Sequence, residues 1–322
     1  MLPWGYKRAF VCCALLFLLG TVFQFLFGGI PPRLLHYPWS VIAALVFTYG
    51  LVLIYTLNDR FPRLRRLYDP YAGVASVVSV TALTVLFGLI PQSTEAGGVA
   101  AALGWTDMRS SWAFNFLVLY LMVGMGSAAV AGLYRLRTAR LASTVSHLAV
   151  YLVMAGAFFG SGDKMEALVT ATVDQPVAVG EDNAGQPVEL PFMLVLHQFI
   201  LEEYPLRPGP VDTLVTEDGR VMTMPPRFPK RFASDVTLLT GKGERRVEIS
   251  VNHPARQGAW RIYQYGYDLS QGKESRISEL LCVRDGWYPV IAAGLWLLLG
   301  AGVLMFVTAG GRRKPKKEEV MP

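Results

Sequence analysis

The chain has 322 residues, of which 52% are hydrophobic and 17% are charged, and its mean hydropathy is +0.36. Soluble domains carry about 25% charged residues, so this composition excludes an ordinary soluble protein. The formal net charge is +6, but no nucleic-acid recognition motif accompanies the basic residues. We therefore expect a lipid bilayer, and no nucleic acid, among the partners of this chain.

Six apolar stretches without charged residues predict membrane-spanning helices. The first covers residues 9–30 and, at about 1.5 Å per residue, reaches about 33 Å, which is enough for a hydrocarbon core of about 30 Å. Its apolar run is longer than a signal-peptide core, so we expect it to remain in the mature protein. The other five stretches lie at 39–56, 72–90, 112–133, 143–161 and 287–309.

Lys and Arg are concentrated in every second link between the predicted helices. Because basic residues in short loops resist translocation, the links rich in them are expected on the cytoplasmic side. The alternate short loops, 31–38 and 91–111, hold one basic residue each, Arg33 and Arg109. We predict a multi-pass protein of the plasma (inner) membrane with cytoplasmic N- and C-termini and an extracytoplasmic (periplasmic) domain. The segments predicted to be cytoplasmic contain Lys7, Arg8, Arg60, Arg63, Arg65, Arg66, Arg135, Arg137, Arg140, Arg312, Arg313, Lys314, Lys316 and Lys317.

The predicted domains follow from this topology. Residues 1–161 form a five-helix transmembrane region, 162–286 an extracytoplasmic domain, 287–309 a final transmembrane helix, and 310–322 a basic cytoplasmic tail. A tail of this kind next to a membrane is a topology signal or a contact with anionic lipid.

The external region is predicted to form strands, because its hydrophobic residues recur with a period of about two. Gly, Pro, Asp and Asn separate the alternating segments. Asp218-Gly219 and Gly241-Lys242-Gly243 supply the positive-φ residues of two hairpins. We expect an inserted all-β, sandwich-like or barrel-like antiparallel domain. Its predicted strands lie at 166–173, 188–204, 213–224, 233–252, 259–269 and 277–283.

Motifs of catalysis are absent from the sequence. Cys12 and Cys13 are adjacent and Cys282 stands alone, so no C-x-x-C redox motif or thiolate metal site is present. Glu202 and Glu203 point to opposite faces of a strand and do not make a working pair. We predict no catalytic residue, and no metal site beyond the iron of a haem.

Four histidines are the candidate ligands. His147 lies about 9–10 Å inside the fifth span, where an ionisable residue is a functional candidate, and a neutral imidazole can bind haem iron. The alternative is a hydrogen bond across a helix interface. His36, in an external aromatic loop, serves interfacial positioning or, as a weaker candidate, binds an external cofactor. His197 and His253 fit structural roles better, because neither has a second ligand at metal spacing.

Several segments of the second half occur in a recognisable order. They are SHLAVYLVMAGAFFGS, LPFMLVLHQFILEEYP, RFASDVTLL, VNHPARQGAWRIYQYGYD and a closing span after VRDG, within about residues 143–309. This pattern resembles the ResB (CcsB) family of cytochrome c biogenesis proteins. The family usually has four spans, so the stretches at 72–90 and 112–133, or the amphipathic link GGVAAALGWTDMRSS between them, look like an addition. The closing motif has Asp285-Gly286 where Asp-Pro is common, and a W-W-D segment of the partner family is missing.

The resemblance implies a system II type subunit that helps carry haem b, as a transient substrate, across the membrane and attach it to apocytochrome c. It implies a CcsA/ResC-like membrane partner and a place in a holocytochrome c synthetase (haem lyase) complex, with no complete active site in this chain. The family's membrane histidine matches His147 by position. Two alternatives stay open: a scaffold that binds no haem, and a haem b or quinone oxidoreductase subunit.

Overall fold

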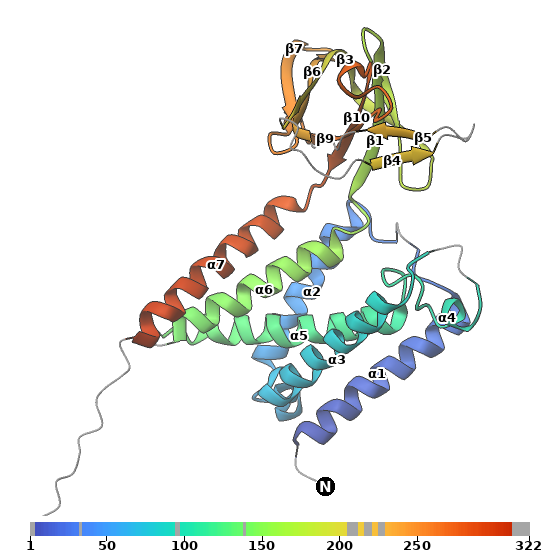
Figure 1. Ribbon diagram of the computed structural model, residues 1–322. Coiled ribbons are helices and arrows are strands. Elements are labelled where there is room, and N and C mark those ends of the chain that lie inside the picture. Colours follow the sequence, from blue (N-terminus) through green and yellow to red (C-terminus); the bar gives the residue numbers. More distant parts are fainter. Residues whose placement is uncertain are drawn as a thin grey trace, which may run out of the picture. The chain divides into compact units, whose positions relative to one another are not determined.

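The computed structural model describes residues 4–31, 34–93, 97–137, 140–204, 212–215, 221–224 and 229–310 (Figure 1). Two compact units divide the chain. One comprises Met1–Asp163 with Trp287–Pro322 and is helical; the other comprises Lys164–Gly286 and is built from strands. We call them the helical unit and the β unit.

The described residues of the helical unit include six helices that are long and apolar enough to cross a membrane, as the sequence predicts. This part of the chain is therefore that of a membrane protein. A 3-10 helix η1 (Pro62–Tyr68) and the short α4 (Val99–Ala102) lie between them. The long helices are α1 (Tyr6–Phe27), α2 (Trp39–Thr56), α3 (Pro70–Leu89), α5 (Trp112–Tyr134), α6 (Leu141–Phe159) and α7 (Tyr288–Gly310).

Helix α5 is central in this unit, because it packs against α1, α2, α3 and α6, while α7 packs along α6. Small residues permit these close approaches. A Cβ atom on Gly132 of α5 would lie 2.5 Å from Oγ1 of Thr144 on α6, and one on Gly294 of α7 would lie 2.9 Å from the carbonyl oxygen of Ala149. The outer sides of the helices expose large apolar side chains, such as Phe25 on α1, which suits contact with lipid.

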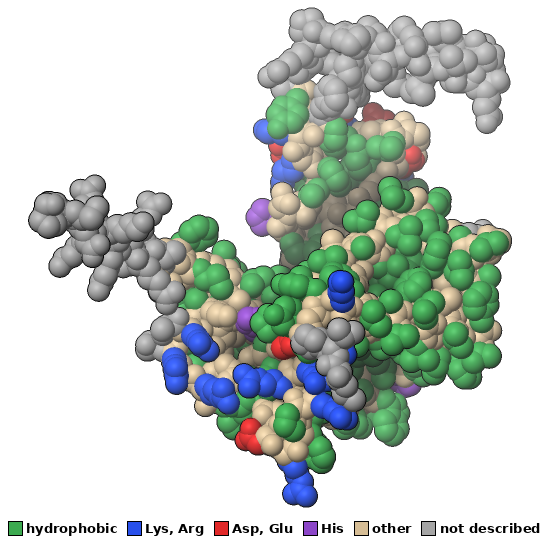
Figure 2. Space-filling model, turned by 90° about the horizontal axis from the view of Figure 1, so that it is seen from below, with side chains coloured by type: hydrophobic (Ala, Val, Ile, Leu, Met, Phe, Trp, Pro, Cys, Tyr) green, Lys and Arg blue, Asp and Glu red, His purple; other side chains and the backbone are tan. Residues whose placement is uncertain are grey.

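The described basic clusters of the helical unit meet at one end, which we call the basic end. The guanidinium of Arg66 lies 5.7 Å from the ring centre of Trp4, joining η1 to the chain before α1. Tyr55 at the end of α2 stacks on Tyr134 at the end of α5, with ring centres 4.9 Å apart. Figure 2 shows Lys and Arg side chains gathered in its lower part. Arg33 and the tail from Arg312 to Lys317 lie outside the described residues.

The β unit is all-β, as predicted, and its main sheet has eight antiparallel strands in the order β7-β6-β3-β2-β1-β10-β9-β8. A separate two-stranded sheet contains β4 (Asp212–Val215) and β5 (Val221–Met224). The strands of the main sheet are β1 (Met165–Thr172), β2 (Pro176–Glu181), β3 (Pro187–Glu203), β6 (Pro229–Thr240), β7 (Gly243–Ser250), β8 (Ala255–Gln257), β9 (Trp260–Tyr267) and β10 (Ile277–Arg284).

The structure differs from the predicted strands in three places. The stretch 233–252 is divided into β6 and β7 by the predicted Gly241-Lys242-Gly243 turn, in which Gly243 has a φ of +134°. Two strands were not predicted: β2, which pairs with both β1 and β3, and the short β8, which pairs with β9. The other predicted turn, Asp218-Gly219, lies outside the described residues.

Of the two forms expected for this domain, the barrel-like one describes the main sheet, because the sheet nearly closes on itself. Ser250, at the end of β7, forms a bridge with His253, just before β8, and Arg245 of β7 donates to the carbonyl of Arg256 in β8. The two ends of the strand order therefore lie side by side. Inside, Ser234 of β6 donates to Oε1 of Gln264 of β9 at 2.7 Å. Nε2 of Gln264 donates to Oγ of Ser278 of β10 at 2.9 Å.

Candidate functional site

His147 lies in the second turn of α6, about 9 Å along the helix from its first residue, Leu141. The helix starts next to Arg137 and Arg140, so His147 lies near the basic end of the helical unit. The side chain is half-buried. It is the one histidine within the six long helices, and all four histidines belong to the described residues.

The hydrogen bond of His147 fixes the form of its ring. Nδ1 lies 2.7 Å from the carbonyl oxygen of Ser143, one turn earlier in α6. A carbonyl oxygen can only accept, so Nδ1 carries the proton and a neutral ring has its lone pair on Nε2. Within the described part of the chain no donor is bonded to Nε2. This is the arrangement in which a histidine binds a metal through Nε2 while the other ring nitrogen is held by an acceptor.

The neighbouring polar side chains of α6 are already engaged. Ser146 donates its hydroxyl to the carbonyl of Ala142 at 2.9 Å. The hydroxyl of Tyr151 lies 2.7 Å from Oγ1 of Thr48 on α2, and Thr144 packs against Gly132 of α5. Among the side chains of α6, His147 is the one that carries an acceptor nitrogen.

His36 lies at the other end of the helical unit, in the exposed link between α1 and α2. The link is held by Asp163, just beyond α6. One carboxylate oxygen of Asp163 accepts from the backbone N–H of Tyr37 at 2.5 Å. The other accepts from the hydroxyl of Ser40 at 2.6 Å and from the indole N–H of Trp287, just before α7, at 2.8 Å. One carboxylate thus joins the ends of three helices beside His36.

The same contacts set the charge of Asp163. Burial acts to raise its pKa, but the donors Ser40, Trp287 and Tyr37, together with the nearby charge of His36, hold the pKa below the usual range of a carboxyl. The group is therefore ionised at neutral pH and remains an acceptor for all three donors.

The two histidines of the β unit lie apart from any ligand cluster. Nε2 of His197 is 2.8 Å from the hydroxyl of Thr237 on the neighbouring strand, and His253 exchanges backbone hydrogen bonds with Ser250. Burial raises the pKa of the Cys282 thiol to about 12, so it is protonated at neutral pH. Among the described residues, no group of three or more His, Cys, Asp or Glu could hold a metal ion.

The sequence identified His147 and His36 as candidates but gave no sign of Asp163 or of the groups around it. Its donors come from residues 37, 40 and 287, which are far from it in the chain. The only local signal is that Asp163 is the first acidic residue after the fifth predicted span. Trp287 also fills the space beside Gly160, where a Cβ atom would lie 2.5 Å from the indole Cγ.

Comparisons with known proteins bear on this region. The model of the ResB-like family matches residues 124–281, from the middle of α5 through α6 and into β10. None of the curated proteins matches this chain. A solved structure named Cytochrome c Heme Lyase CcmF is 14% identical with a TM-score of 0.33, over 84% of this chain and 45% of that chain. This chain thus spans less than half of that protein's length, and so low a TM-score supports no conclusion. The match confirms the predicted resemblance: residues 124–281 match the model of the ResB-like family.

Proposed function

We propose that this protein is a membrane subunit of cytochrome c biogenesis that receives haem b at His147 and helps to carry it across the membrane. Haem is the cargo of this chain and not a resident group. Its attachment to the thiols of apocytochrome c is shared with a CcsA/ResC-like partner, since this chain has no complete active site. The ResB-like region supports cytochrome c biogenesis as the process.

The observation that carries the proposal is the open Nε2 of His147. Its Nδ1 is bonded to Ser143, so the ring is already in the tautomer that binds iron and loses little freedom when it does so. The apolar sides of neighbouring helices suit a porphyrin, and the depth of His147 is within reach of the cytoplasmic side in the topology that we propose.

Arginines at the basic end give the haem a second contact. Haem carries two propionate carboxylates, and Arg137 and Arg140 lie exposed within about two to three turns of His147 in sequence. Arg pairs with carboxylates through two parallel hydrogen bonds, which orient as well as attract. We place the propionates toward the basic end and the iron toward His147.

His36 supplies a second, outer position in this proposal. The part of α6 from His147 to Phe159 alone measures about 18 Å, so one iron cannot be bound by residues at both ends of the helix. Haem received at His147 would therefore move before it met His36. Asp163 holds the link on which His36 lies and keeps it at the end of α2.

The two alternative functions, an oxidoreductase subunit and a scaffold without haem, require different residues in the helices. A haem b or quinone oxidoreductase subunit usually presents paired histidines on facing helices, whereas His147 has no histidine opposite it in the six long helices. A scaffold without haem needs no histidine at this depth. These differences make His147 the residue that separates the three hypotheses.

The test is the haem content of the full chain purified together with its partner. We expect His147→Gly to lower haem, measured from the absorption spectrum, by about tenfold or more, because the iron loses its axial nitrogen. Ser146→Gly is the matched control, because it places the same helix-weakening residue at the adjacent position. An unchanged haem content in His147→Gly would favour the scaffold.

A further inference from the structure

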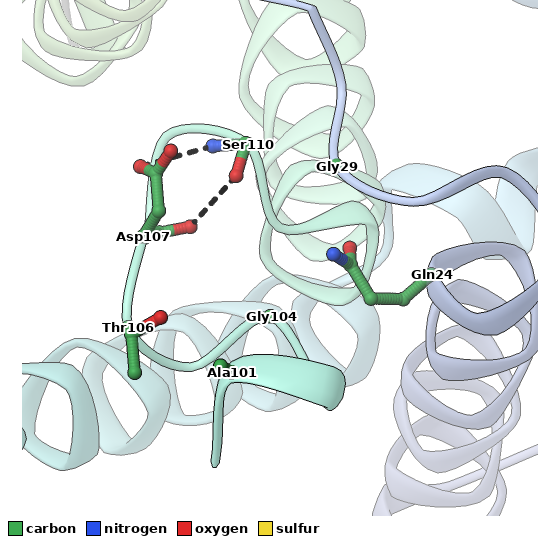
Figure 3. A pocket seen from close by; sticks show the side chains of 7 residues that line it. All are labelled: Gln24, Gly29, Ala101, Gly104, Thr106, Asp107 and Ser110. Carbon is green, nitrogen blue, oxygen red and sulfur yellow. Dashed lines mark hydrogen bonds between the residues drawn. The ribbon is translucent and has the colours of Figure 1, made fainter. Parts of the chain in front are cut away.

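A polar pocket lies at the end of the helical unit opposite the basic end (Figure 3). It is formed by the end of α1, by α4 and by the link from α4 to α5. Its volume is about 220 Å³, well above the about 10–15 Å³ that one water needs. The proposed haem path does not use this pocket, which lies outside the ResB-like region.

Gln24 presents a buried donor to the pocket. Its side chain is 8% exposed, and Oε1 accepts from the backbone N–H of Trp112 at 3.3 Å. Because a backbone N–H can only donate, the atom facing Trp112 is the oxygen, and the amide NH₂ is the free end. Figure 3 shows this amide pointing into the hollow between Gly29 and Gly104. Within the described residues Nε2 has no acceptor.

Glycine at position 104 makes room for that amide. A Cβ atom there would lie 2.5 Å from Cδ of Gln24, and the φ of Gly104 is +70°, in the region that disfavours other residues. The pocket is therefore built around the Gln24 side chain and is not merely a gap between helices.

Asp107 brings a negative charge to the opposite wall. Its Oδ1 accepts from the backbone N–H of Arg109 at 3.1 Å and of Ser110 at 3.4 Å. In the part of the chain that the structure describes, no Lys or Arg side chain forms an ion pair with Asp107. The carboxylate retains acceptor capacity, and the hydroxyl of Thr106 lines the pocket beside it.

These groups favour a zwitterionic ligand, which carries both a negative and a positive charge. The amide of Gln24 and the hydroxyl of Thr106 donate to an anion, while Asp107 accepts from a cation that carries N–H groups. The pocket lies where α1 ends, and Phe25, Leu26 and Phe27 expose apolar side chains on that helix. A headgroup in the pocket would thus have acyl chains running along an apolar helix face.

We propose that this pocket binds the phosphoethanolamine headgroup of a membrane lipid, with its phosphate at Gln24 and Thr106 and its ammonium at Asp107. Choline lipids fit less well, because a quaternary ammonium has no N–H to donate to the carboxylate. Anionic lipids without an amine place a negative charge beside Asp107 with no cation to offset it.

The test compares lipids on the full chain in detergent, by native mass spectrometry and by the midpoint of thermal unfolding. We expect phosphatidylethanolamine to remain bound to the wild type and to raise the midpoint more than phosphatidylcholine or phosphatidylglycerol does. Asp107→Asn should weaken phosphatidylethanolamine binding roughly tenfold and abolish its advantage over phosphatidylcholine. Asp59→Asn, an exposed carboxylate at the basic end, is the matched control and should behave as the wild type.

Gln24→Leu provides a second variant, which loses the phosphate donor but keeps the charge of Asp107. It should lower affinity for phosphatidylethanolamine and phosphatidylcholine alike, since both carry the phosphate. The proposal is overturned if the wild type holds the three lipids equally, or if Asp107→Asn keeps the preference. Equal stabilisation by soluble phosphoethanolamine would overturn the assignment to a lipid.

Discussion

At the scale of single residues, the chemistry depends on which atoms are already bonded. The ring of His147 is oriented by a carbonyl of its own helix, so α6 itself positions the proposed haem ligand. Asp163 is ordered by long-range contacts instead, because its donors come from two distant segments, at residues 37–40 and at residue 287. The first arrangement needs only a formed helix, and the second needs the assembled helical unit.

Asp163→Asn tests the second arrangement. The carboxylate accepts three hydrogen bonds, and hydrogen bonds to a charged group contribute about 1.5–3 kcal/mol each when desolvated and less when partly exposed. We expect the variant to lower the thermal midpoint of the full chain at pH 7, measured in detergent, while Asp59→Asn leaves it unchanged.

The pH dependence of the same variant gives a sharper check. The pKa of Asp163 is lowered in the folded protein, so its contribution to stability is present above the unfolded pKa of about 3.9 and is lost as the pH falls through the folded value. The difference between wild type and Asp163→Asn should therefore shrink as the pH falls below about 4. A difference that grows with acidity would contradict this assignment.

At the scale of elements, the β unit is held by pairing between strands that are distant in sequence. Strand β1 pairs with β10 along its whole length, from Met165 with Arg284 to Thr172 with Ile277. Both connections to the helical unit thus leave from neighbouring strands. The polar group of Ser234, Gln264 and Ser278 joins strands from opposite parts of the sheet order within an otherwise apolar interior.

Gln264→Leu tests this buried polar group. The side chain is 6% exposed and bonds to Ser234 and Ser278, so the change leaves two buried hydroxyls with one partner fewer. A buried polar group without its partner costs about 1–3 kcal/mol. We expect a lower midpoint of thermal unfolding, partly restored when Ser234→Ala and Ser278→Ala are added. A triple variant no more stable than Gln264→Leu would show that the loss comes from packing.

The spans and most strands could be predicted from the sequence, because both follow from local patterns. Charged groups are costly inside a bilayer, so the gaps between charges mark the helices, and the predicted 39–56 coincides with α2. Alternation marks strands but not their partners, so the closure of the sheet and the bridge between Ser250 and His253 could not be predicted. His147 could be predicted as a candidate because an ionisable residue stands out within an apolar span. The role of Asp163 could not be predicted, because it depends on tertiary contacts.

At the scale of the whole molecule, the proposal requires the basic end and the β unit to lie on opposite sides of the membrane. Membrane-impermeant thiol labelling in cells tests this, with Cys12 and Cys13 replaced by Ala. Cys282 is not expected to react with the reagent, because the thiolate is the reactive form and burial raises the pKa of this thiol to about 12. We expect Lys242→Cys, in the exposed β6–β7 turn, to react in intact cells, and Asp59→Cys to react only after permeabilisation. Labelling of both, or the reverse order, would refute this topology.

The central claim is a bond between the iron of bound haem and Nε2 of His147. Its most direct measurement is electron–nuclear double resonance of the ferric complex, prepared with histidine enriched in ¹⁵N, because this method resolves the coupling of an iron-bound nitrogen. We predict that the coupling is present in the wild type and in His197→Ala and is absent in His147→Gly. A coupling that survives unchanged in His147→Gly would place the ligand elsewhere and contradict the proposed role of α6.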